Sequence, residues 1–285
     1  MKKILCCALI CFSLCSGCED TNMRLATEAG VDAVKALTLS EDQVRQLSAR
    51  TAKHLDAQHE LAPAHTPYAQ RLDRLFAKHQ NFEGESFHSQ VYLSSKVNAF
   101  ALADGNIRVY AGLMDILSDE ELLFVLGHEM GHVHHDHVQE KMRVALAGKA
   151  LRKGVASQQN IIGDLARSTL GAFIQALLNA QFSQQEEKEA DDYGLRFVQH
   201  IGLGGEPAVS ALNKLAELGN EHSFLSSHPA PGKRAQRLQK QMHNPDSSEQ
   251  EPGLLQRVFA LVHSLIELLL TVLRWVAGLI VGSQP

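Results

Sequence analysis

The chain has 285 residues, 45% hydrophobic and 21% charged, a composition that excludes collagen-like, low-complexity and wholly disordered proteins. The formal net charge of -5 and the few aromatic residues (11 Phe, 4 Tyr and 1 Trp) argue against a protein that binds nucleic acid. Two counts are unusual, since there are 15 His and all 5 Cys lie within the first 18 residues.

The amino terminus is typical of an export signal. Two lysines precede an apolar run over residues 4–14, which is too short to span a bilayer but matches the core of a signal peptide. The run ends at Cys-Ser-Gly-Cys over residues 15–18, which resembles a bacterial lipobox with Cys15 in place of the usual Leu. We therefore expect removal of residues 1–17 and acylation of Cys18, with a plain secretory signal or an uncleaved anchor as alternatives. The mature chain would then keep one cysteine and form no internal disulfide.

Residues 18–59 are predicted to form a polar tether followed by a helix. Ser40 and Gln43 have the spacing of a capping box, which predicts that this helix begins at Ser40. A second helix is expected over residues 68–79, where apolar side chains fall on one face. The pattern then changes to strands, one over residues 87–93 and a hairpin over residues 98–111 that turns at Asp-Gly-Asn.

The rest of the chain has mainly helical patterns. A second capping-box pattern at Ser118 predicts a helix that runs through residue 137. Residues 139–182 are helical in pattern but interrupted by glycines, so they form either a lid over a cleft or a helical hairpin of the core. Further helices are expected over residues 182–200, 207–218 and 233–242. The predicted fold is therefore α+β, predominantly helical, with a small antiparallel sheet.

The helix expected to end at residue 137 contains an H-E-x-x-H motif, His128-Glu129-Met130-Gly131-His132. Histidines four residues apart project from one helical face, so both can ligate one zinc ion while Glu129 lies beside its bound water. Residues 122–127 are apolar, which indicates a partly buried helix in which unpaired His and Glu would be costly. The motif alone also fits a solvated helical face.

A second acidic cluster supports the zinc hypothesis. Glu187 follows His132 by 55 residues in a predicted helix and can supply a third ligand, which leaves the fourth position open for water. Asp191, one helical turn later, can bond the far nitrogen of a ligand histidine and fix its tautomer. The sequence thus predicts one Zn²⁺ per chain.

Four blocks between about residues 60 and 240 carry a family resemblance. They are Asn98-Ala99-Phe100-Ala101-Leu102-Ala103-Asp104-Gly105, then the H-E-x-x-H motif, then Phe182-Ser183 with Glu187, Ala190, Asp191 and Gly194, and finally Ser227-His228-Pro229 with Arg234. In this order they resemble the zinc metallopeptidases of the HtpX and CAAX-prenyl-endopeptidase type, most closely their periplasmic lipoprotein branch. Ala103 and Asp104 replace Pro and Gly, and Gln184 replaces Arg, which affects the hairpin shape and one supporting contact but not the metal site.

The resemblance implies a zincin-type peptidase domain over residues 60–243 in which His128, His132 and Glu187 ligate zinc and Glu129 is the general base. It also implies that His228 approaches the zinc, either to stabilise the oxyanion or to block the water position. The alternative for His228 is a histidine packed beside a proline turn. Arg234 would lie nearby and stabilise the site or the developing charge.

The resemblance also implies how a substrate binds and where the protein acts. The edge strand formed by Asn98, Ala99, Phe100 and Ala101 would pair with an extended polypeptide. We expect a metalloendopeptidase of the bacterial periplasm, lipid-anchored with the outer membrane favoured, that removes misfolded or misassembled membrane-associated proteins. The alternatives are a latent protease that acts mainly as a chaperone or assembly factor, and a structural lipoprotein.

Two regions keep simpler interpretations. His134, His135 and His137 suggest a second metal, but solvated residues at a helix end are favoured, and Glu189 is expected on the surface. Residues 244–253 form a polar linker, and residues 254–285 an apolar, amphipathic helix. Glu267 and Arg274 disfavour a helix that spans the membrane, so we expect this helix to lie on the membrane surface or on a partner. The alternative is a helix packed on the protein's own core.

Overall fold

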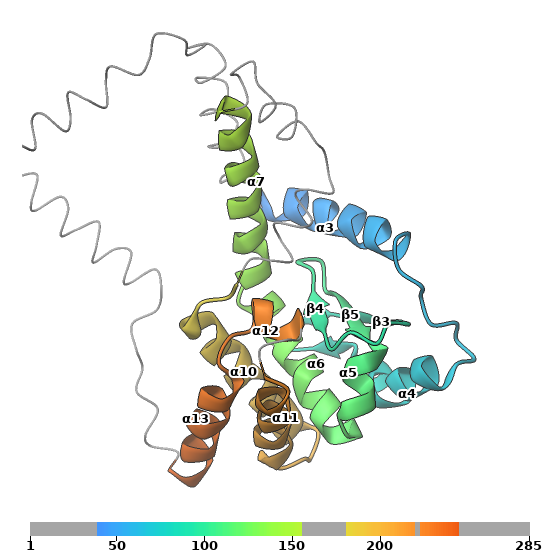
Figure 1. The fold of residues 1–285 in the computed structure, drawn as a ribbon, viewed down its shortest axis with the longest axis vertical. Helices are drawn as coiled ribbons and strands as arrows, with labels where there is room; N and C mark the ends of the chain where they lie inside the picture. Colours follow the sequence, from blue (N-terminus) through green and yellow to red (C-terminus); the bar gives the residue numbers. More distant parts are fainter. Residues whose placement is uncertain (1–38, 156–180, 220–222, 245–285) are drawn as a thin grey trace, which may run out of the picture. The chain divides into compact units, whose positions relative to one another are not determined.

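The computed structural model describes residues 39–155, 181–219 and 223–244 (Figure 1). One compact unit is Met1–Leu238, and a second unit begins at Gln239, where only the end of one helix and the residue after it are described. The predicted signal peptide, Cys18, most of the tether, the linker from residue 245 and the C-terminal helix lie outside the described residues. No helix in the described ranges is both long and apolar enough to cross a membrane.

The described chain is mainly helical, which confirms the predicted α+β class. Its helices are α3 (Glu41–Asp56), α4 (Pro67–Phe76), the short 3₁₀ helix η1 (Ala77–His79), α5 (Ala111–Ile116), α6 (Asp119–His134), α7 (His137–Val155), α10 (Gln184–His200), α11 (Glu206–Glu217), α12 (Ser223–Ser227) and α13 (Pro231–His243). The strands are β1 (Asn81–Phe82), β2 (Glu85–Ser86), β3 (His88–Tyr92), β4 (Ala99–Ala101) and β5 (Asn106–Tyr110).

Capping boxes mark the starts of three of the described helices, α3, α6 and α10. Both predicted capping boxes are present, at Ser40 before α3 and at Ser118 before α6, and Ser183 forms a third before α10. The predicted end of the H-E-x-x-H helix at residue 137 is wrong, because α6 ends at His134. Asp136 has a φ of 59°, a left-handed conformation that aspartate tolerates but that an α-helix cannot continue through. The chain therefore turns at Asp136 before α7 begins.

The larger sheet has three strands in the order β3-β5-β4. The predicted hairpin is confirmed, since β4 pairs antiparallel with β5 and Ala99 lies opposite Val109. The sheet is mixed rather than purely antiparallel, because β3 pairs parallel with β5. The chain passes from β3 to the far strand, β4, and returns through the middle, so β5 runs in the direction of β3. Within the described residues β4 is an edge strand, and α6 packs beside it (Figure 1).

Helices α6 and α10 pack closely because small residues face each other. A Cβ at Gly131 would lie 2.9 Å from the Ala190 Cα, and a Cβ at Gly194 would lie 3.0 Å from the backbone nitrogen of His128. The missing side chains let the two backbones approach, which places the acidic cluster of α10 against the H-E-x-x-H face of α6.

A buried ion pair joins α3 to the sheet. Arg108 donates hydrogen bonds from Nε and Nη2 to the two carboxylate oxygens of Asp56, both at 2.9 Å, and Tyr92 donates its hydroxyl to Asp56 at 2.8 Å. Burial raises the pKa of Asp56, but the bonds from Arg108 and Tyr92 outweigh it and hold that pKa below its usual value. The Arg108 side chain is only 3% exposed, so the pair ties the first described helix to the core.

Candidate metal centre

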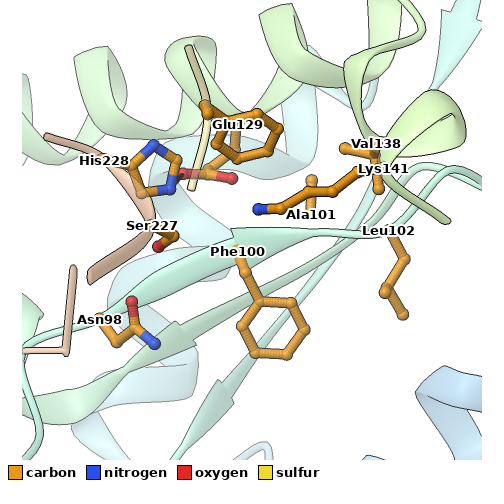
Figure 2. Close-up of a pocket in the computed structure, with 10 residues that line it drawn as sticks. Asn98, Phe100, Ala101, Leu102, Glu129, Val138, Lys141, Ser227 and His228 are labelled. Carbon is orange, nitrogen blue, oxygen red and sulfur yellow. Dashed lines mark ion pairs between the residues drawn. The ribbon is translucent and has the colours of Figure 1, made fainter. Parts of the chain in front are cut away.

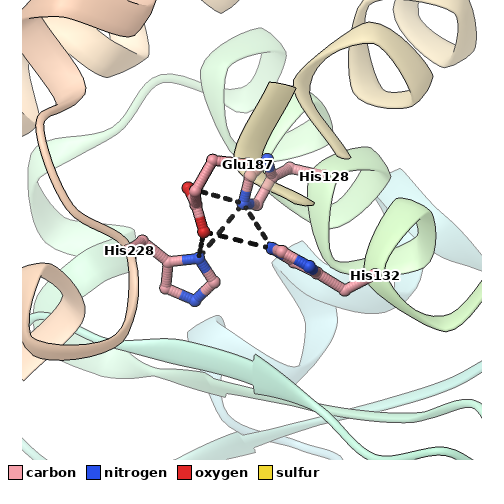
Figure 3. A group of neighbouring side chains, drawn as sticks. All are labelled: His128, His132, Glu187 and His228. Atoms are coloured by element: carbon pink, nitrogen blue, oxygen red, sulfur yellow. Dashed lines mark hydrogen bonds and ion pairs between the residues drawn. The ribbon is translucent and has the colours of Figure 1, made fainter. Parts of the chain in front are cut away.

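Four buried side chains from three parts of the chain converge on one point. His128 and His132 come from α6, Glu187 comes from α10, and His228 follows α12 (Figure 3). One potential ligand atom from each lies within 4.8 Å of the others. The Nε2 atoms of His128 and His132 are 3.1 Å apart, and Glu187 Oε1 lies 3.4 Å from His132 Nε2. The structure thus brings together the three predicted ligands.

The donor set fits a divalent transition metal. His128 Nδ1 lies 3.0 Å from Asp191 Oδ1, so the Nδ1–H donates to this carboxylate and the Nε2 lone pair faces the cluster. Burial lowers the pKa of His132 well below its usual value, so this imidazole also offers a neutral nitrogen. Two neutral imidazoles and a carboxylate in a buried site are a typical zinc donor set. Asp191 lies where the sequence predicted it.

Arg234 holds the acidic side of the cluster. Its Nε and Nη2 atoms donate to the two oxygens of Asp191 at 2.9 and 2.6 Å, and its Nη1 forms an ion pair with Glu187 Oε2. Burial raises the pKa of both carboxyls, but Arg234 outweighs it, lowering that of Asp191 to about 2 and that of Glu187 well below its usual value. Arg234 therefore keeps both groups ionised and contacts the ligand residues themselves.

His228 and Glu129 occupy the pocket side of the cluster. His228 Nδ1 lies 2.9 Å from Glu187 Oε1 and 3.2 Å from His128 Nε2, while its Nε2 faces Glu129 Oε1 at 3.5 Å. The His228 ring stacks on Phe224 with ring centres 4.4 Å apart, which fixes its orientation. Glu129 Oε1 is buried and has no hydrogen-bond partner in the described part of the chain. It is thus placed to exchange a proton with a bound molecule.

The cluster opens into a pocket beside the edge strand (Figure 2). The pocket is lined by Asn98, Phe100, Ala101, Leu102, Glu129, Val138, Lys141, Phe182, Ser227 and His228. Ala99, the remaining residue of the predicted substrate strand, does not line it and is fully buried. The pocket therefore brings the candidate base and one member of the metal cluster, His228, next to β4, whose outer edge pairs with no other strand among the described residues.

One residue behind the cluster was assigned wrongly from the sequence. His137 is 5% exposed rather than solvated, and its Nδ1 lies 3.1 Å from His132 Nδ1. Glu189 is outside the metal cluster and its side chain is 33% exposed, as expected, but its carboxylate bonds His137 Nε2 at 2.9 Å. The turn at Asp136 carries His137 back against His132, which helical spacing could not indicate.

The other two histidines after the motif lie away from the cluster. His134 is half-buried and pairs with Glu85 at 3.3 Å, whereas His135 is exposed, as expected for the end of a helix.

The fold and the buried His/Glu site define a metallopeptidase, and comparison with known proteins places it more closely. The model of "Peptidase family M48" matches residues 63–242. Metalloprotease LoiP of Escherichia coli (strain K12) is 40% identical over 230 residues, which are 80% of this chain and 91% of that protein. Metalloprotease YcaL of the same organism is 33% identical over 232 residues, which are 79% of this chain and 91% of that protein.

A further relative is longer than this chain. The beta-barrel assembly-enhancing protease of Yersinia pestis is 28% identical over 239 residues, which are 76% of this chain but 46% of that protein. The chain belongs to peptidase family M48, which confirms the resemblance found in the sequence. It is a metalloendopeptidase and its substrates are polypeptides.

Proposed function

We propose that this protein is a zinc-dependent endopeptidase of the bacterial envelope, in which His128, His132 and Glu187 hold one zinc ion. The observation that carries the proposal is the convergence of three buried lone pairs beside Glu129 Oε1, which has no hydrogen-bond partner among the described residues. In the described ranges the ion-pair partner of Glu129 is His228, at 3.5 Å, and a carboxylate buried with so distant a partner is costly without a ligand.

The residues in and behind the pocket have separate roles in the reaction. When bound, a zinc ion would acidify a water molecule and polarise the scissile carbonyl. Glu129 takes a proton at Oε1 and later passes it to the leaving amine. Asp191 keeps His128 in the tautomer whose Nε2 is free to bind metal, and Arg234 keeps Glu187 ionised.

The outer edge of β4 pairs with no other described strand, which supports pairing with an extended substrate. Two backbone hydrogen bonds join β4 and its flanking residues to β5: the carbonyl of Asn98 accepts from the amide of Tyr110 at 3.0 Å, and the amide of Leu102 donates to the carbonyl of Asn106 at 2.8 Å. Because alternate residues of an antiparallel strand bond its neighbour, the backbone groups of Ala99 and Ala101 point toward the free edge. Backbone pairing of this kind is tolerant of sequence, which suits an enzyme that removes damaged proteins.

The lipid anchor is supported by the N-terminal sequence, and the quality-control role by the name of a relative. The Cys-Ser-Gly-Cys segment over residues 15–18 supports acylation of Cys18 and, through it, attachment to a membrane of the periplasm. One relative is named a beta-barrel assembly-enhancing protease, which supports misassembled membrane proteins as substrates. Labelling cells with an alkyne fatty acid tests the anchor, since the parent should be labelled and Cys18→Ser should not. Equal labelling of both would refute it.

A latent protease is a second candidate, favoured by the position of His228. Its Nδ1 is one of the four clustered ligand atoms, so this side chain can take the open position of the metal. If His228 blocks the metal, His228→Ala should raise turnover. If His228 instead stabilises the oxyanion, the same substitution should lower turnover. His135→Ala, which changes an exposed histidine, is the matched control.

Casein digestion tests the enzyme assignment. We expect the purified protein to carry one zinc and to cut casein, and Glu129→Gln to carry one zinc and cut nothing. If both bind zinc and neither cuts, the latent or chaperone function is supported instead. If neither binds zinc, the metal assignment is wrong.

A further inference from the structure

Lys141 reaches into the pocket from α7, and neither the motifs nor the metal site account for it (Figure 2). Its Nζ lies 3.6 Å from the centre of the Phe182 ring. The same ring stacks on His132, with centres 3.7 Å apart and planes 19° from parallel. Because both neighbours lie so close to the ring centre, they occupy opposite faces of Phe182. The ammonium is thus held in place one ring away from a candidate metal ligand.

Among the described residues, this ammonium has no acidic partner at close range. In the described ranges of the chain no carboxylate forms an ion pair or a hydrogen bond with Lys141. Burial lowers its pKa to about 8, against a weaker opposing pull from Glu129 and Glu187, so it is still mostly protonated at pH 7. A cation in such a position is costly unless an anion pairs with it.

The walls around Lys141 define what could approach it. Leu102 and Val138 are apolar, and Phe182 covers one side of the ammonium. Substrate paired with the free edge of β4 would run along Ala99 and Ala101, and alternate side chains of a strand point to opposite faces. A substrate side chain on the face of α7 would therefore meet these apolar side chains and the ammonium of Lys141 among them.

We propose that Lys141 forms a subsite for a carboxylate of the substrate, supplied by an acidic side chain next to the scissile bond or by the chain's own C-terminus. The inference rests on the proposed function for the path of the substrate along β4. An ammonium in partly apolar surroundings gains a strong, charge-assisted hydrogen bond from a carboxylate and nothing comparable from an amide of the same shape. It would repel a lysine or arginine in the same position.

Peptide binding to the zinc-loaded Glu129→Gln protein tests the subsite without requiring cleavage. In one set of fluorescent peptides the C-terminus is amidated and a single Glu is moved from position to position, with the all-Gln peptide as the neutral counterpart. A further peptide has Gln at every one of these positions and a free C-terminal carboxylate. We expect one Glu position, or the free C-terminus, to bind about tenfold more tightly than its neutral counterpart, which corresponds to about 1.4 kcal/mol. Which peptide gains the affinity identifies the source of the carboxylate.

Added substitutions show whether Lys141 causes the preference. Lys141→Met should abolish it and leave the neutral peptides unchanged, because Met keeps the length of the stem, and Lys141→Arg should retain it. Lys78→Met, which removes an exposed lysine, should have no effect. Equal affinity for all peptides, or an equal loss for all of them in Lys141→Met, would overturn the proposal. Failure of the unsubstituted protein to cut casein would overturn the proposed function instead, because the binding ratio does not depend on cleavage.

Discussion

Replacing Arg234 by Met should destabilise the metal-free protein strongly. The guanidinium is 7% exposed and donates two hydrogen bonds to Asp191, at 2.9 and 2.6 Å, besides its ion pair with Glu187. Its removal takes the arginine partner from the buried Glu187 and leaves the buried Asp191 with the longer 3.6 Å ion pair to Arg237, and breaking a buried pair in this way costs about 3–5 kcal/mol. In a domain of this size the melting temperature should fall by about 10 °C.

Arg45 of α3 provides the matched control. It pairs with Glu41 at 3.0 Å, but the two side chains are 47% and 65% exposed, so Arg45→Met should cost about 1 kcal/mol or less. Thermal and urea denaturation of both variants should be measured with a chelator present, because bound zinc would offset the lost charge. Equal losses for the two variants would refute the reasoning, since burial would then add nothing to the contribution of Arg234.

Three other substitutions test other parts of the structure. Asp56→Asn leaves Arg108 buried without its partner and should cost about 3 kcal/mol at pH 7. Folding lowers the pKa of Asp56, so the difference in free energy of unfolding between parent and variant, measured by urea denaturation, should have its full value above about pH 4 and shrink as the pH falls further. A difference that does not change with pH would contradict this. His137→Phe removes the contact with His132 and should weaken zinc binding about 10- to 100-fold in chelator competition, whereas unchanged affinity would exclude a positioning role. Gly194→Ala should cost about 1–3 kcal/mol in thermal denaturation, because the added Cβ meets backbone atoms of α6 that cannot move aside; an unchanged melting temperature would show that the two helices can separate.

Local patterns predicted the helices and the metal cluster well. The capping boxes at Ser40 and Ser118 depend on residues three apart, and the H-E-x-x-H face depends on residues four apart, so neither requires knowledge of the rest of the chain. Glu187 could be predicted as the third ligand because it lies in a predicted helix that also carries Asp191, one turn further on. The family then supplied His228 and Arg234, which no local pattern indicates.

The features that the sequence did not indicate depend on long-range geometry. His137 contacts His132 only because the backbone at Asp136 adopts a left-handed conformation, and the residue itself gives little sign of that. Lys141 enters the pocket because this turn sets the direction of α7. The parallel pairing of β3 with β5 follows from the order of the strands in space, which alternation of apolar residues does not reveal.

X-ray absorption at the zinc edge tests the central claim most directly. The account predicts one zinc per chain with nitrogen and oxygen neighbours at about 2.0–2.1 Å, scattering from imidazole rings, and loss of the metal in His132→Phe. A sulfur neighbour at about 2.3 Å would instead place the metal on the cysteines of the first 18 residues. That result, or a spectrum unchanged in His132→Phe, would contradict the site described by His128, His132 and Glu187.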